Sequence, residues 1–378
     1  MVEPFEYEVS PFLTCFSSVE DPRISRKKLY PLIEIIFGAF VATLCGARGW
    51  RDIEDFCEAR IHVLRKFLPY DNGIASYATF SRCFGFLNPK TFESVFIKWM
   101  SSWQDSCKGV IAIDGKTIRR SFDFAKGIKP MHMLTAFASN ARVVLGQEKV
   151  DAKSNEINAI PVLLELLTVK GAIITIDAMG CQKNIAQLIR DKKADYVLAL
   201  KGNHGDLLDD IKTFFTHENL NNKKNFDCHR EVDKGHGRIE VRTCWATSNI
   251  DWLQEKSNWK DLKSIAMIEG ARRFNGKETC EKRFFISSLS ANSKLLSHAI
   301  RSHWGIENTL HWTLDMVFRE DESRIRNRNA AQIMALFRRL SINLLRMIPE
   351  KESIGIKRRS RRAAWCDGYL ERVILQGF

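Results

Sequence analysis

Apolar positions in the first hundred residues recur at the three-to-four-residue spacing of amphipathic helices. Residues 25–68 follow this spacing with a break at "GARGW", and Asn88-Pro89 later marks a turn followed by a helix start. The most apolar run, "IIFGAFVATLCGA" (35–47), is shorter than the roughly 20 residues needed to span a bilayer. These patterns predict a helical N-terminal domain, residues 1–104, with one helix buried in its core.

From residue 109 the pattern changes to short β-branched runs. "GVIAIDGKTIRRS" predicts a strand that stops at an aspartate, and "MHMLTAFAS" and "RVVLGQEKV" predict two more strands. A helix in "EINAIPVLLELLTV", a strand in "KGAIITIDAMG", a helix in "CQKNIAQLIRDKK" and a strand in "ADYVLALKGN" follow. This order is typical of an α/β fold around a mixed sheet.

Extended segments interrupt this pattern at about 226–290, and helical spacing returns from about 294 to 346. We therefore predict a second domain at 105–348, with a β-rich insertion at about 226–290, and a basic C-terminal tail at 349–378. The extended segment "GRIEVRTCWA" places Arg238, Glu240 and Arg242 on one face.

Charge narrows the range of partners. The net charge is +13, and residues 319–378 alone carry 14 Lys and Arg against 7 Asp and Glu. Such an excess favours a polyanion, most often nucleic acid, over a merely soluble basic surface. The ten cysteines show no CxxC pair or zinc-like spacing, and "MVEPFEYEVSPF" shows no cleavable signal, so we expect reduced thiols, a cytoplasmic location and no membrane partner.

Two aspartates occupy equivalent positions in the α/β part. Asp114 follows Val110–Ile113, and Asp177 follows Ile173–Ile176. Catalytic and ligand groups collect at such strand ends, although each aspartate could instead only cap a turn. If the strands are neighbours, the carboxylates converge and favour a bound cation, Mg²⁺ or Mn²⁺ rather than zinc.

Glu307 is the candidate for a third carboxylate. In "RSHWGIENTLHWTLD" it lies one helical turn from His303 and from His311. The same stripe could be a zinc site, although it lacks the HExxH spacing, or a row of core histidines. Rival acids follow closely, namely Asp315, Glu320 and Asp321.

At this point the chain is identified as similar to bacterial insertion-sequence transposases of the DDE class, in the H-repeat-associated branch found beside Rhs elements. The resembling stretches are "DPRISRKKLYPL" with "GARGW", "IAIDGKTIRRS", "KSNEINAIPVLL", "TIDAMGCQKNIAQLI", "YVLALKGN", "GHGRIEVR" and "HWGIENTLHWTLDMVFRED". They cover nearly the whole chain in family order.

The resemblance implies an RNase H-like catalytic domain and DNA strand transfer. It places the metal-binding catalytic acids at Asp114, Asp177 and Glu307, with Mg²⁺ or Mn²⁺ as cofactor. The expected reaction is cleavage at element ends, then attack of the freed 3′-OH on target DNA, with a homo-oligomer acting on double-stranded DNA. A DNA-binding protein without catalysis and a nuclease that cuts without joining remain alternatives.

The chain departs from the family pattern at several places. Tyr77 and Ala78 replace a usual His and Asp, His204 replaces a glutamine, and His303 and Leu314 stand where a related signature has Arg and Lys. Residues near the acids or on the extended segment are candidate DNA contacts: Lys116, Arg119, Lys201, His236, Arg238, Arg242, His303 and His311.

Overall fold

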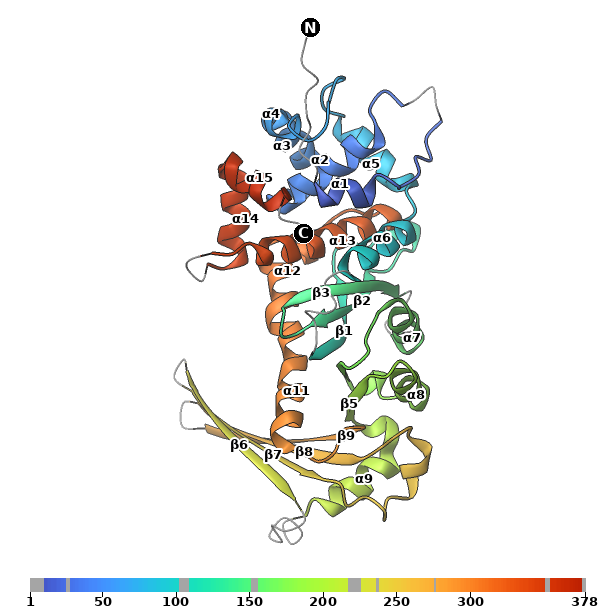
Figure 1. Ribbon diagram of the computed structural model, residues 1–378, viewed down its shortest axis with the longest axis vertical. Coiled ribbons are helices and arrows are strands. Elements are labelled where there is room, and N and C mark those ends of the chain that lie inside the picture. Colours follow the sequence, from blue (N-terminus) through green and yellow to red (C-terminus); the bar gives the residue numbers. More distant parts are fainter. Residues whose placement is uncertain are drawn as a thin grey trace.

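The helices at one end of the molecule come from both ends of the chain. The computed structural model describes residues 10–24, 28–101, 109–150, 156–216, 226–235, 238–274, 277–350 and 354–375. Helices from the two chain ends pack together in this region (Figure 1). They are α1 (Pro11–Phe16), α2 (Leu32–Leu44), α3 (Trp50–Ala59), α4 (Ile61–Leu64), α5 (Tyr77–Phe86), α6 (Pro89–Ser101), α13 (Arg328–Met347), α14 (Ile356–Trp365) and α15 (Asp367–Leu375).

A mixed sheet occupies the rest of the molecule. Within the described residues it has nine strands in the order β3-β2-β1-β4-β5-β9-β8-β7-β6. The first five strands along the chain are β1 (Val110–Ile118), β2 (Met131–Ala138), β3 (Val143–Val150), β4 (Ile173–Ile176) and β5 (Asp195–Leu200). Among the strand pairs of the described residues, only β1–β4 and β4–β5 are parallel. The predicted α/β fold around a mixed sheet is confirmed.

Strands β6 to β9 extend this sheet, and helices accompany it. Strands β6 (Asp227–Gly235), β7 (Arg238–Thr247), β8 (Ser264–Phe274) and β9 (Lys277–Ser287) continue the same sheet through the antiparallel β5–β9 pair. Three helices connect consecutive strands in the sequence: α7 (Glu156–Leu166) follows β3, α8 (Lys183–Asp191) follows β4 and α9 (Gly205–Phe214) follows β5. Helix α11 (Ser293–Gly305) contacts β1, β4 and β5 as well as β6, β7 and β8, so it bridges the two parts of the sheet (Figure 1).

The chain after α11 does not form one regular helix. It continues as the π-helical turn η9 (Ile306–His311), then α12 (Trp312–Met316) and the 3₁₀ turn η10 (Glu320–Glu322), before α13 begins. π-helical turns concentrate at functional sites because the extra residue re-aims the side chains around it. The helical segment expected at about 294–346 is therefore divided, and its irregular part carries Glu307.

The predicted end of the first strand is wrong. The strand expected to stop at Asp114 continues to Ile118, so the aspartate lies inside β1. The parallel ladder with β4 ends at Ile113, but the antiparallel ladder with β2 continues from Asp114 to Ile118. Because the second partner supplies hydrogen bonds past the aspartate, the strand persists where its β-branched run ends.

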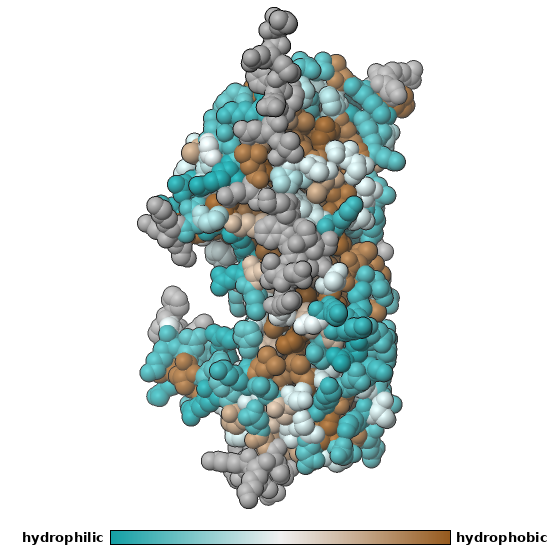
Figure 2. Space-filling view, viewed as in Figure 1, coloured by the Kyte–Doolittle hydropathy of each residue, from teal (hydrophilic) through white to brown (hydrophobic). Residues whose placement is uncertain are grey.

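The surface is mostly hydrophilic on the face shown in Figure 2, with hydrophobic residues in separate patches and an indentation in the outline between the helical end and the β6–β7 hairpin. Within the described ranges, we find no helix both long enough and apolar enough to cross a membrane.

Candidate active site

Asp114 lies in β1, and Asp177 directly follows the neighbouring parallel strand β4. Each directly follows one member of the cross-strand pair Ile113–Ile176, which closes the β1–β4 ladder. Adjacent strands lie about 4.8 Å apart, so the two aspartates start from neighbouring backbone positions. The Asp177 carboxylate also accepts hydrogen bonds from the backbone N–H groups of Met179 (3.0 Å) and Gly180 (3.3 Å). Asp177 therefore caps a turn, and this capping fixes one carboxylate oxygen beside Asp114's strand.

The electrostatics of Asp114 record the proximity of the other acids. Burial raises the pKa of Asp114 to about 7, opposed by the backbone N–H of Gly115 and assisted by the negative charges of Asp177, Glu307 and Glu156. A carboxyl group surrounded by like charges resists ionisation until a cation or a proton relieves the repulsion. Of the groups acting on Asp114, two are the acids singled out from the sequence.

Glu307 enters from the helical layer between two histidines that touch the same strands. The Nδ1 of His303 forms a 3.1 Å hydrogen bond with the hydroxyl of Thr175 on β4. The Nδ1 of His311 lies 3.8 Å from the Asp114 carboxylate. One histidine is thus next to β4 and the other next to β1, and Glu307 lies between them in the chain on the exposed side of η9.

Both histidines are held in their neutral forms. Burial lowers the pKa of His303, while the charge of Asp177 and a hydrogen bond with the Thr175 backbone act in the opposite direction. Burial, with the positive charges of Arg339 and Lys116, lowers the pKa of His311 to about 3. The expectation of core histidines therefore describes much of their environment, although both remain in contact with the acidic site.

All three carboxylates line one cavity of about 1030 Å³ beside the sheet. Its floor is polar and acidic where the β1–β4 ladder ends, and its side walls include residues of β7, β8, β9 and α11. Basic side chains line the same cavity, and these are Lys201, Lys212, Arg242, Arg272, Lys282 and Arg283. Glu240 and Glu281 also line it and pair with Arg242 and Arg283. A cavity with acids at its floor and basic side chains on its walls suits a phosphodiester, whose charge the basic groups and a cation can neutralise.

The candidate DNA contacts have different environments. Lys201 is exposed on the cavity wall, and Arg242 lines the cavity while pairing with Glu240 at 2.7 Å. The side chain of Arg119 is 81% exposed. Lys116, by contrast, is buried and paired with two aspartates, so its charge is already neutralised inside the protein. Arg238 begins β7, and His236 lies outside the described residues.

Sequence reasoning missed a buried pair beneath the acids. The Nε2 of His132 lies 2.5 Å from the Glu156 carboxylate, and its Nδ1 lies 2.8 Å from the Thr117 hydroxyl. A Cβ atom at Gly115 would come within 2.4 Å of His132, so only glycine fits beside Asp114. The stretch "KSNEINAIPVLL" contained the signal, because it places an acidic residue at the start of a predicted helix.

The donor set matches a hard divalent cation. In the part of the chain that the structure describes, no three His, Cys, Asp or Glu side chains are already gathered as a metal cluster, and this includes His303, Glu307 and His311. The residues nevertheless fit such an ion, because the cavity offers carboxylate oxygens, and a cation would favour ionisation of Asp114, whose pKa is raised by burial and by the charges of the neighbouring acids.

Comparisons with known proteins cover nearly the whole chain. The family model described as "DDE_Tnp_1-associated" matches residues 13–100, and the one described as "Transposase DDE domain" matches residues 105–344. The chain is 41% identical to "Putative transposase YncI" of Escherichia coli O157:H7, over 97% of this chain and 95% of that protein. It is 37% identical to "H repeat-associated putative transposase YhhI" of Escherichia coli K12, over 97% and 98%.

Among solved structures, a piggyBac transposase chain in a synaptic complex with hairpin DNA matches with a TM-score of 0.41 and 11% identity. That match covers 93% of this chain and 76% of the other.

Proposed function

Because the chain belongs to the DDE transposase family and is a DNA transposase, we propose that Asp114, Asp177 and Glu307 are its catalytic acids. The single observation that carries this proposal is their shared cavity, in which the charges of Asp177 and Glu307 act on Asp114. The sheet order β3-β2-β1-β4-β5, with acids on β1 and after β4, supports an RNase H-like catalytic core.

The family generally uses a divalent metal ion, and in this chain the three acids would hold Mg²⁺ or Mn²⁺. Such ions stabilise the charge that develops on attacking and leaving oxygens during phosphoryl transfer. The protein's own residues do the positioning. Asp177 is fixed by its turn, and His303 ties the Glu307 helix to Thr175.

The proposed chemistry needs no energy source, because each step exchanges one P–O bond for another. In cleavage, a water oxygen bonds to phosphorus while the 3′-oxygen leaves with a proton. In strand transfer, that freed 3′-OH attacks a target phosphodiester, and the target's own 3′-oxygen leaves. The exposed Lys201 on the cavity wall supports contact with phosphates of double-stranded DNA, and Arg242 and Arg283 line the same cavity while paired with Glu240 and Glu281.

The test is incubation of purified protein with end-labelled element DNA and Mg²⁺, with cleavage and joining scored separately. We expect both products from the wild type and neither from Asp114→Asn, which should still bind DNA. Asp251→Asn is the control, because that carboxylate is 90% exposed on a loop outside the cavity.

Each alternative gives its own result in this assay. Cleavage without joined product would indicate a nuclease, and binding without cleavage would indicate a recognition protein that no longer acts on DNA. Cleavage by Asp114→Asn would refute the assignment of the acids. Light scattering of the protein–DNA complex tests the accompanying proposal that a homo-oligomer acts on the DNA.

A further inference from the structure

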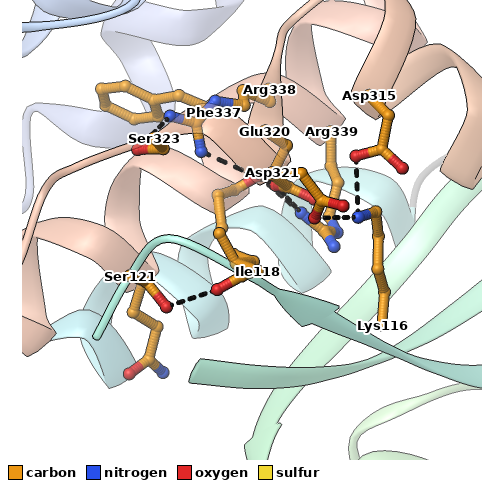
Figure 3. Close-up of polar contacts among 12 residues, drawn as sticks. Lys116, Ile118, Ser121, Asp315, Glu320, Asp321, Ser323, Phe337, Arg338 and Arg339 are labelled. Carbon is orange, nitrogen blue, oxygen red and sulfur yellow. Dashed lines mark hydrogen bonds and ion pairs between the residues drawn. The ribbon is translucent and has the colours of Figure 1, made fainter. Parts of the chain in front are cut away.

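Lys116 lies two residues after Asp114, in the same strand and on the same face. Its side chain is only 7% exposed, and its Nζ lies 2.8 Å from the carboxylate of Asp315 and 2.8 Å from that of Asp321 (Figure 3). A buried ammonium group already paired with two carboxylates cannot reach a DNA phosphate without leaving both.

The two partners of Lys116 belong to the segment that carries Glu307. Asp315 is on α12, which directly follows the π-helical turn η9, and Asp321 is on η10 just beyond. The Lys116 ammonium on β1 thus holds the segment after Glu307 at two points, one on α12 and one on η10. Because a π-helical turn lacks the regular bonding of an α-helix, contacts of the adjoining segment decide where it sits against the sheet.

A further group of buried charges, around Glu320, connects η10 and α13 to the β2 residue that pairs with Asp114. Glu320 is fully buried, and its carboxylate lies 2.8 Å from Arg339 Nη1 and 3.6 Å from Arg338 (Figure 3). The Nε of Arg339 donates a 3.3 Å hydrogen bond to the hydroxyl of Thr135, which is the β2 residue paired with Asp114. The contacts therefore run from β1 through η10 and α13 to β2, beside the strand position of Asp114.

We propose that Lys116 is a positioning residue that sets the place of Glu307 relative to Asp114 by holding α12 and η10 against β1. This inference rests on the proposed catalytic role of Asp114 and Glu307. Without the ammonium, Asp315 loses the charge of Lys116 and Asp321 keeps only its pair with the exposed Arg119 at 3.1 Å, so the helix end moves away from the sheet. A misplacement of about 1 Å at a reacting centre can cost about 100-fold in rate.

The experiment compares Lys116→Met with Arg190→Met. Arg190 is a matched control because it also bridges two aspartates, at 2.5 Å to Asp195 and 2.9 Å to Asp261, but at the amino end of β5, away from the acids. Three quantities are measured for each variant: single-turnover cleavage at saturating DNA and Mg²⁺, the DNA Kd at several salt concentrations, and thermal unfolding.

For Lys116→Met we expect cleavage slowed about 100-fold, with the Kd and its salt dependence as in the wild type. Arg190→Met should lower the melting temperature and leave cleavage per folded molecule unchanged. Hydrogen exchange of residues 306–316 should accelerate in Lys116→Met and stay unchanged in Arg190→Met, which separates positioning from a general loss of stability.

Asp315→Asn covers the case in which Lys116→Met does not fold, because it removes only the helix-side partner and leaves the Asp321 contact. It should slow cleavage in the same direction but less, and accelerate exchange over the same residues. In the double variant Lys116→Met/Asp315→Asn, the rate loss should be smaller than the product of the two single losses, since both remove one interaction.

Three results would overturn the proposal. One is cleavage by folded Lys116→Met at the wild-type rate, and another is a wild-type rate in Asp315→Asn. The third is weaker DNA binding by Lys116→Met with a salt slope reduced by about one, which would make Lys116 a phosphate contact. The Asp114→Asn variant distinguishes a failure of this positioning proposal from a failure of the proposed catalytic site, because cleavage by Asp114→Asn would refute the catalytic site itself.

Discussion

Two residues of α13, Phe337 and Arg339, point into interiors of opposite chemistry. The ring of Phe337 lies 5.5 Å from that of Phe40 and 5.9 Å from that of Phe84, and it also contacts rings from α1 and α6. Arg339 is just as completely buried, yet it contacts the Glu320 carboxylate and the Thr135 hydroxyl. A single helix thus joins an aromatic interior to a charged one.

The difference shows what each interior is for. Aromatic side chains gain stability from buried area and shape, so many packings of similar volume serve nearly as well. Charges buried in pairs contribute little net stability, but they tolerate few arrangements, because a displaced partner leaves an uncompensated charge. We infer that the helical end supplies stability and the charged interior next to β1 supplies geometry.

Two buried glutamates make the same comparison. Burial raises the pKa of Glu93 on α6, although hydrogen bonding from Gln332 and the charge of Lys90 act against it. Burial alone would also raise the pKa of Glu320, but the charges of Arg339, Arg338 and Lys116 lower it. Burial without buried arginine partners therefore favours the protonated acid at Glu93, and the buried arginines favour the ionised acid at Glu320.

The largest effect is expected from Glu320→Gln. This change keeps the side-chain shape but leaves Arg338 and Arg339 without their buried counter-charge, which typically costs about 3–5 kcal/mol. Urea denaturation followed by circular dichroism measures the loss. A loss below about 1 kcal/mol, the size expected of exposed pairs, would contradict the view that charge, not shape, governs this interior.

A smaller loss is expected from a similar change of shape in the aromatic interior. Phe337→Leu should cost about 1–2 kcal/mol, because the ring is replaced by another large apolar group that neighbours can follow. Phe337→Ala is the control, and the cavity it leaves should raise the loss to about 3–5 kcal/mol. Equal losses for both variants, measured in the same urea titration, would mean that ring geometry rather than volume is what matters there.

The pH dependence of unfolding should differ in sign between the two glutamates. Because the folded pKa of Glu93 is raised, its contribution to stability is present below the ordinary glutamate pKa and is lost as pH rises through the folded value. The lowered pKa of Glu320 contributes stability above the ordinary value, lost as pH falls through the folded one.

Glu93→Gln should therefore reduce the loss of folding stability that accompanies rising pH. Glu320→Gln should remove the loss of folding stability that accompanies falling pH. Melting temperatures recorded from acid to neutral pH test both signs. A Glu93→Gln curve parallel to that of the wild type would contradict the raised pKa.

The smallest effect is expected from an exposed ion pair with contact geometry like that of Lys116. Lys183 and Glu255 lie 2.8 Å apart with side chains 44% and 35% exposed. Lys183→Ala should cost less than about 1 kcal/mol, and the cost should shrink at high salt. Comparing Lys183→Ala with Lys116→Met in the same denaturation assay isolates the contribution of burial to the stability of an ion pair. Comparable losses of stability in the two variants would show that burial does not account for the difference expected between them.

Much of the secondary structure followed from local pattern. The helix predicted at 156–169 is confirmed as α7, the one at 181–193 as α8, and the strand at 194–203 as β5. Local signals did not reveal α9, and the segment expected as a basic tail contains α14 and α15, which pack against α13 and α1. The basic residues of α14 concealed an amphipathic helix whose buried positions Ser360 and Ala363 are small.

The sequence by itself determined the membership in the DDE transposase family and the alternation of strands and helices, because long motifs and hydrophobic period are local properties of the chain. Only the tertiary structure decided that Asp114 and Asp177 follow the same cross-strand pair, since strand order is not encoded in spacing. It also decided that Lys116 faces two aspartates about 200 residues away rather than solvent. Whether a charged side chain is a surface group or a buried one depends on which distant segments cover it, and no local pattern contains that information.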